Sequence, residues 1–75
     1  MSAEDWERRD NVLGLLEEAL GILNEMADDL EERISNMEEY FTSSPVMEQL
    51  ESRKEAVENA ISYIEDAISE LEGME

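Results

Sequence analysis

Apolar residues recur along the first half of the chain at alternating steps of three and four. The unbroken part of this series is Leu13, Leu16, Leu20, Leu23, Ala27, Leu30, Ile34 and Met37. Such spacing is typical of a heptad repeat, written abcdefg, whose a and d positions form an apolar seam along one helix face. With Leu13 at position a, the pattern predicts a helix over residues 3–41, with Ser2 as its N-cap.

A second series of the same kind follows a turn. Its members are Met47, Leu50, Val57, Ile61, Ile64, Ile68 and Leu71, with Lys54 at one a position. Between the two series, Pro45 cannot continue a helix but suits the first position of a new one, with Ser44 as the N-cap. The sequence therefore predicts a second helix over residues 45–72, ended by Gly73.

The short turn folds the two helices into an antiparallel hairpin. The predicted fold class is thus all-α, with residues 1–75 in a single small domain. Folding about the turn brings the d positions opposite each other, as Met37 with Leu50, Leu30 with Val57, Leu23 with Ile64 and Leu16 with Leu71. In one mixed layer, Lys54 approaches Ile34.

Apolar residues also occupy c and g positions, beside the seam. This arc covers roughly half of each helix, whereas a two-helix contact needs only a and d. Because small soluble proteins rarely leave so large a patch exposed, we expect a second copy to cover it and complete a four-helix bundle. A higher oligomer or a different partner helix is the alternative. The expected dimer interface, called the apolar face below, comprises Val12, Leu15, Ala19, Ile22, Met26, Ala56, Ala60, Tyr63 and Ala67.

Three residues have two interpretations each. Trp6, at an a position near the open end of the hairpin, either covers the end of the bundle or anchors a partner. Gly14 and Gly21 lie at b, on the outer side of the first helix. Each costs about 1 kcal/mol of helix propensity relative to Ala, so each is either simply tolerated or allows a close approach.

Composition narrows the possible functions. The chain has 5 Lys and Arg against 22 Asp and Glu, a net charge of −17, no His and no Cys. Disulfides, thiolate metal sites and His-based zinc or acid–base chemistry are therefore excluded, and we expect no cofactor. Nucleic acid and anionic membranes repel such a chain, so any electrostatic partner should be basic. Without a long apolar stretch or a signal-peptide pattern, the expected location is the cytoplasm.

Many of the acids form rows at e and f positions, opposite the apolar arc. Those expected to bind a partner, called the acidic face below, are Glu17, Glu18, Glu25, Glu31, Glu32, Glu38, Glu51, Glu58 and Glu65. In an antiparallel hairpin e positions meet, and the pairs expected to repel are Glu38 with Glu51, Glu31 with Glu58, and Glu17 with Glu72. A bundle selected only for stability would place Lys on one side, so this repulsion indicates that the acids have a use.

Charge density suggests what that use is. The first predicted helix, about 39 residues long, would measure about 58 Å. A dimer of net charge −34, twice −17, would carry about one charge per 1.7 Å, as duplex DNA does. We therefore expect a non-enzymatic protein that mimics nucleic acid and blocks a basic nucleic-acid-binding site on a host protein. The alternatives are a coiled-coil assembly module or chaperone whose acids only maintain solubility, and the surface of a halophilic protein.

Enzymatic interpretations lack essential groups. Carboxylate pairs such as Glu48 with Glu51 have the spacing with which all-helical nucleotide pyrophosphatases bind Mg²⁺. Here, however, the pairs lie on outer b and e positions, and few cations are present to hold phosphate. The cluster at residues 28–32 lacks the glycine and the alternating ligands of a calcium loop. We expect no catalytic or metal-binding residues.

The stretch from Asn36 to Glu72, NMEEYFTSSPV followed by MEQLESRKEAVENAISYIEDAISELE, resembles small acidic helical-hairpin proteins of phages and mobile elements. Those proteins often have an aromatic residue before a Pro-containing turn. In size, charge and fold the chain is also similar to DNA mimics that block host nucleases, including anti-CRISPR and anti-restriction proteins. The resemblance implies an anti-defence inhibitor that acts in the host cell cytoplasm.

Overall fold

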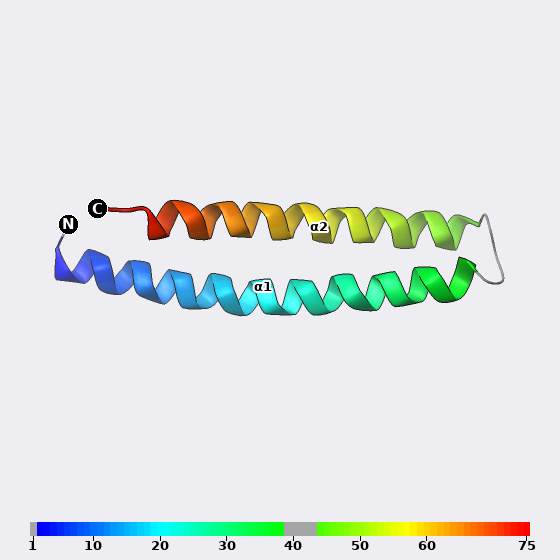
Figure 1. Cartoon of the computed structure of the whole chain (residues 1–75), viewed down its shortest axis with the longest axis horizontal. Coiled ribbons are helices and arrows are strands. Elements are labelled where there is room, and N and C mark those ends of the chain that lie inside the picture. Colours follow the sequence, from blue (N-terminus) through cyan, green and yellow to red (C-terminus); the bar gives the residue numbers. More distant parts are fainter. Residues whose placement is uncertain (1, 39–43) are drawn as a thin grey trace.

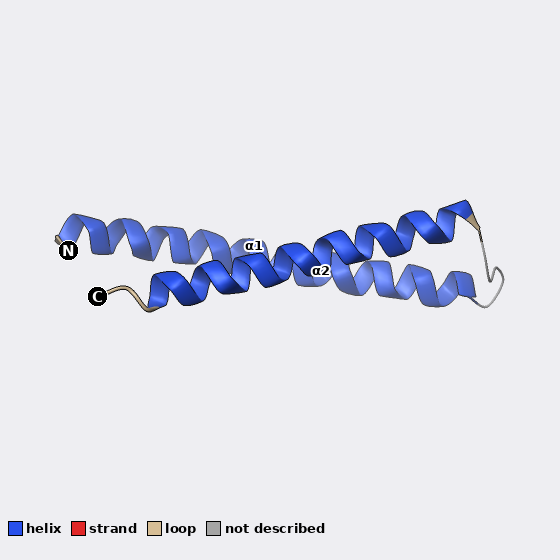
Figure 2. Cartoon of the chain, turned by 90° about the horizontal axis from the view of Figure 1, so that it is seen from above, coloured by secondary structure: helices blue, strands red, loops and turns tan. Residues whose placement is uncertain are grey.

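The computed structural model describes residues 2–38 and 44–75 and contains two helices there, α1 at Ala3–Glu38 and α2 at Pro45–Glu72. The helices lie side by side and antiparallel in a rod that measures 57 × 14 × 14 Å between Cα atoms (Figure 1). Seen from the perpendicular direction, they cross at a shallow angle near their middles (Figure 2). The predicted helical hairpin is therefore confirmed. The predicted end of the first helix, at residues 39–41, lies outside the described residues.

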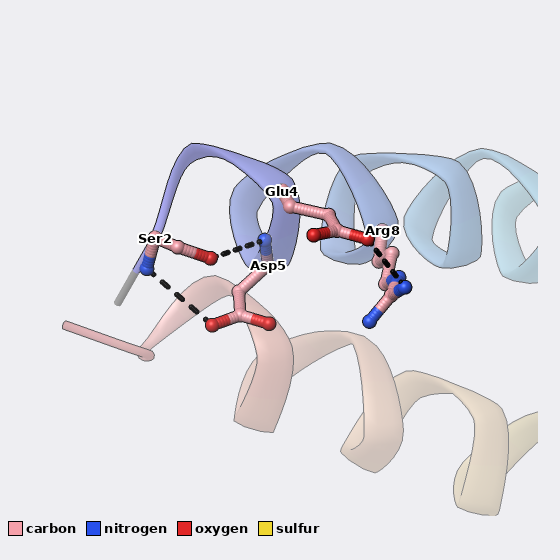
Figure 3. A network of polar contacts seen from close by, with 4 residues as sticks. All are labelled: Ser2, Glu4, Asp5 and Arg8. Atoms are coloured by element: carbon pink, nitrogen blue, oxygen red, sulfur yellow. Dashed lines mark hydrogen bonds and ion pairs between the residues drawn. The ribbon is translucent and has the colours of Figure 1, made fainter.

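Ser2 caps α1 as predicted. Its Oγ accepts a hydrogen bond from the backbone N–H of Asp5 at 3.2 Å, and Asp5 Oδ2 accepts one from the backbone N–H of Ser2 at 3.4 Å (Figure 3). This reciprocal arrangement is a capping box, which satisfies N–H groups that lack helical partners. On the same turns of α1, Arg8 pairs with Glu4 at 2.5 Å.

The caps of α2 also match their predicted positions. Ser44 has an extended backbone, and its Oγ accepts a hydrogen bond from the Met47 N–H at 3.1 Å, while Pro45 opens the helix. At the other end, Gly73 follows the last helical residue and its N–H donates to the Ser69 carbonyl at 3.1 Å. Gly73 has a right-handed conformation, with φ of −82°, so it ends α2 without the left-handed geometry that usually favours glycine.

The buried core lies in the half of the hairpin nearest the turn. Its buried side chains are Leu30, Ile34, Met47, Leu50 and Val57, and Leu23, Ala27, Met37 and Ile61 pack against them. The predicted layers of Met37 with Leu50 and of Leu30 with Val57 fall within this cluster. Burying five side chains leaves a small core, even for a chain of 75 residues.

In the open half of the hairpin the seam is only half-buried. This holds for Leu13, Leu16, Leu20, Ile64, Ile68 and Leu71. With 36 residues, α1 is longer than α2, which has 28, and it continues past the end of α2 at the open end (Figure 1). The first turns of α1 therefore project beyond the last turn of α2 (Figure 1). The open half is where an additional helix would bury the most apolar surface.

Substituting Gly14 and Gly21 with Ala should stabilise the fold. An added Cβ at either position would meet nothing within 4 Å. We expect each change to raise the free energy of unfolding by about 1 kcal/mol, because Ala restricts the unfolded chain and favours helix. Urea unfolding monitored by circular dichroism measures the change. A loss of stability on substitution would instead indicate that another molecule approaches these glycines closely.

Candidate binding surfaces

The acidic face is fully accessible. All nine of its predicted residues are exposed, as is every other Asp and Glu among the described residues. The f-row acids Glu18, Glu25 and Glu32 point away from the seam and make no ion pair with another described residue. Their carboxylates are thus available to a cationic partner.

At one layer, the predicted repulsion between e-row acids is relieved. Lys54 Nζ pairs with Glu31 across the hairpin, and it lies 3.6 Å from Glu58 Oε1 on its own helix. The expected juxtaposition of Glu31 with Glu58 therefore includes a shared cation, which offsets the repulsion between the two carboxylates. Lys54 leaves its seam position beside Ile34 and extends to the e edge, because its long stem can pack on apolar surface while its ammonium stays in water.

Beside this ion-paired layer, an acidic groove runs along the e edge. It is lined by Glu31, Ile34, Glu38, Glu51, Lys54, Glu55 and Glu58. The predicted facing acids Glu38 and Glu51 both belong to it, whereas the third predicted pair, Glu17 and Glu72, lies outside it. Among the described residues, no group of three or more acids has the geometry to hold a metal ion. The groove can attract cationic side chains but contains one cation of its own.

Replacing Lys54 with Met should remove a stabilisation that depends on pH. The hydrogen bond to Glu31 raises the pKa of Lys54 above 10.5, an effect that desolvation partly offsets. A raised folded-state pKa favours folding fully below the unfolded value of 10.5, and this contribution disappears as pH rises through the folded value.

Thermal unfolding of both proteins between pH 8 and pH 12 tests this expectation, and its readout is the difference between their melting temperatures at each pH. Wild type should lose stability relative to Lys54→Met as pH rises above about 10.5. A difference that stays constant across this range would contradict the role of the ion pair. The comparison is insensitive to any gain from burying Met at the seam, because that gain does not change with pH.

The apolar face remains largely uncovered in the single chain. Its large side chains have high exposed fractions, with Leu15 at 65%, Ile22 at 54% and Tyr63 at 72%. Val12, Met26 and Ala56 are exposed as well, while Ala19, Ala60 and Ala67 are half-buried. The face is therefore available for contact with another helix.

A groove that the sequence did not predict adjoins the apolar face on the turn side. It is lined by Met26, Asp29, Leu30, Arg33, Arg53, Ala56 and Val57. Arg33 and Arg53 come from different helices, and neither forms an ion pair within the described part of the chain. Both occupy g positions, as the apolar residues Met26 and Ala60 do, so extending the heptad assignment to charged residues would have revealed them. They place two cations in one groove of a rod whose net charge is strongly negative.

Trp6 lies half-buried near the open end. The Arg9 guanidinium stacks over its ring, 4.3 Å from the ring centre, and forms an ion pair with Asp10 at 2.9 Å. This cation–π contact shields one side of the indole. It is compatible with both interpretations of Trp6, as a cover for the bundle end and as an anchor.

Comparison with known protein families, curated proteins and solved structures gave no match. Neither described helix has a stretch apolar enough to cross a lipid bilayer. The geometry of the two faces therefore carries the functional argument.

Proposed function

We propose that this chain is a non-enzymatic, strongly acidic cytoplasmic protein that forms a homodimer and mimics nucleic acid. In this role its acidic face occupies a basic nucleic-acid-binding site on a host protein and blocks that site, as an anti-defence inhibitor would. The observation that carries the proposal is the exposure of every described acid along a narrow helical rod. Such a rod offers a partner anionic groups on a rigid scaffold, as a nucleic-acid backbone does.

The density of charge agrees with this role. Glu39 lies outside the described residues, so the net charge of −17 becomes −16, spread over a rod 57 Å long. That is one charge per about 3.6 Å, close to the value of about 3.4 Å for one strand of B-DNA. Two copies aligned over their full length would carry one per about 1.8 Å, close to duplex DNA. A basic groove built for nucleic acid would attract such a rod rapidly, at rates that fall with added salt.

Pairing of two copies is favoured by the imbalance between the two halves of the hairpin. The open half has a half-buried seam next to the exposed side chains Leu15, Ile22 and Tyr63. A second copy would cover these residues and complete a four-helix bundle, in which the acidic faces of both copies point outward.

The same exposed side chains favour a second candidate function. A coiled-coil assembly module or chaperone would use the apolar face to bind a helix of a different protein, and its acids would serve only solubility. The two functions differ in the face that meets the partner. In mimicry the partner binds the acidic face, and added salt weakens this binding. In an assembly module the partner binds Leu15, Ile22 and Tyr63, and added salt does not weaken this binding.

Affinity capture from a bacterial lysate distinguishes these functions. The chain would be immobilised through a tag after Glu75, and bound proteins would be eluted either with increasing NaCl or with a 20-base-pair DNA duplex. Mimicry predicts that the captured proteins bind nucleic acid and are released by both treatments. Retention that resists both salt and duplex would contradict mimicry. If such retention were also lost on changing Leu15 to Glu, it would favour the assembly module.

A further inference from the structure

α1 carries a second seam beside the one that faces α2. Its c and g positions alternate in steps of three and four, and the apolar middle consists of Val12, Leu15, Ala19, Ile22 and Met26. Asp5 and Arg8 precede this middle, and Asp29 and Arg33 follow it. Each end of the seam therefore has one acid and one base, with five apolar residues between them.

The charges on this seam are complementary to those of an antiparallel copy. Asp5 lies 14 residues before Ala19, and Arg33 lies 14 residues after it. An antiparallel α1–α1 pair centred on Ala19 therefore places Asp5 beside Arg33 of the second copy. The same operation brings Arg8 level with Asp29 of the second copy, within one residue. Because the pair has two-fold symmetry, both contacts occur twice.

The fold leaves space for such a pair. The c and g positions lie about 100° around the helix from the a and d positions, the angle at which adjacent contacts meet in a four-helix bundle. Asp5 and Arg8 lie on the first turns of α1 (Figure 3). The N-terminal end of α1 continues past the last turn of α2 (Figure 1). The groove that contains Arg33 and Arg53 is open on the same face of the hairpin. The first turn of α1, with Glu4 and Asp5, and the groove that contains Arg33 and Arg53 thus lie at opposite ends of one face and carry opposite charges.

The alternative two-fold arrangement is electrostatically unfavourable. If the two-fold axis ran parallel to the rod, the turns that join the two helices would lie at the same end of the dimer in both copies. Arg33 and Arg53 of one copy would then lie at the same level as Arg33 and Arg53 of the second copy. Four guanidinium groups would then gather in one layer, and like charges in contact destabilise an interface. A two-fold axis perpendicular to the rod avoids this repulsion. It places Arg33 and Arg53 of each copy near the first turn of α1 of the other copy, which carries Glu4 and Asp5.

We infer that two copies associate through antiparallel α1 helices, with the first turns of each α1 in the arginine groove of the other. The inference rests on the pairing in the proposed function and specifies its geometry. Because Ala19 lies about 25.5 Å from the Ser2 end of a rod that is 57 Å long, the copies are offset, and the pair measures about 63 Å. With a net charge of −32 for the described residues of two copies, its charge density becomes one charge per about 2.0 Å, between the values for one DNA strand and for duplex DNA.

Charge-swap variants test this geometry. Asp5→Arg and Arg33→Asp each place like charges in contact twice per homodimer, so each should weaken self-association at least tenfold. Mixing the two variants restores both opposite-charge contacts, and a heterodimer should form with an affinity close to that of the unmodified pair. Asp5 and Arg33 lie about 42 Å apart within one chain, so restoration cannot arise inside a single copy. A loss of helix capping by Asp5→Arg occurs in two copies of its homodimer and in one copy of the heterodimer, so circular dichroism of the Asp5→Arg variant measures that loss separately.

Sedimentation equilibrium of each variant and of their mixture gives three informative outcomes. Weak homodimers with a restored heterodimer support the antiparallel geometry. Dimers that neither variant weakens, or a mixture without restoration, would overturn that geometry and leave the pairing itself intact. An unmodified chain that stays monomeric would instead refute the pairing in the proposed function.

A cysteine substitution gives a second, independent test. The chain contains no Cys, so Ala19→Cys introduces a unique thiol at the inferred two-fold axis. A disulfide requires two Cα atoms about 4.4–6.8 Å apart. Because the inferred axis brings position 19 of both copies together, oxidation should convert most of this variant to a covalent dimer. With the axis along the rod, Ala19 would instead face Ala67 of the second copy. Cross-linking only in a mixture of Ala19→Cys and Ala67→Cys would overturn the inference.

Discussion

Introducing Glu at both Leu15 and Ile22 is expected to separate the two copies. Each dimer would then hold four carboxylates where it held four apolar side chains, and each lost burial of a Leu or Ile removes about 1.5–3 kcal/mol. Taken together, we expect self-association to weaken by about 1,000-fold or more. Both residues are exposed in the single chain, so the substitutions remove no contact from the buried core near the turn.

Sedimentation velocity measures this effect, and circular dichroism reports whether the helices persist. The matched control changes Asn11 and Asn59 to Glu, which adds the same two charges per copy on exposed f positions. The control should associate as the unmodified chain does. If both variants dissociate equally, net charge rather than the apolar face would govern association, and the proposed interface would be wrong.

Removing the charge from Glu18, Glu25 and Glu32 should produce the second large effect. Changing all three to Gln removes six charges per dimer from the f row, which faces outward and lies apart from the Lys54 ion pair. If a basic site binds this row, affinity should fall about tenfold or more, and its dependence on salt should decrease. The fold should be unaffected or slightly stabilised, since the change lowers the self-repulsion of the chain.

The matched control for this change lies at the end of the chain. Changing Asp66 to Asn and both Glu72 and Glu75 to Gln removes the same number of charges from outside the acidic face. Binding of a partner captured from lysate, titrated at two salt concentrations, should be weakened by the f-row variant far more than by this control. Equal weakening by the two variants would indicate a general charge effect and no defined acidic site.

The sequence was sufficient to predict the hairpin because local signals agreed with each other. The heptad series locate the core layers around Leu30 and Val57, and Ser2 and Ser44 mark the helix starts that the structure contains. Pro45 excludes a continuous helix between the series. In a two-helix protein these local signals determine most of the topology, because only one antiparallel neighbour is available.

Details that depend on side-chain reach were not predictable in the same way. Heptad position assigns Lys54 to the seam, yet its flexible stem carries the ammonium to Glu31, which relieves a repulsion that position alone implied. Likewise, the g positions of Arg33 and Arg53 can be read from the sequence. Their sharing of one groove, however, depends on the register between α1 and α2. A helical wheel gives direction but not the length or conformation of a side chain.

The single chain exposes both the acidic face and the apolar face, and only self-association would leave the acidic face alone at the surface, so self-association is the central claim. Sedimentation equilibrium of the unmodified chain in 0.15 M NaCl, over the micromolar range, tests it most directly. Pairing predicts a species of about 17 kDa, twice the chain mass of 8.6 kDa. A helical protein that sediments at 8.6 kDa at every concentration would contradict the account.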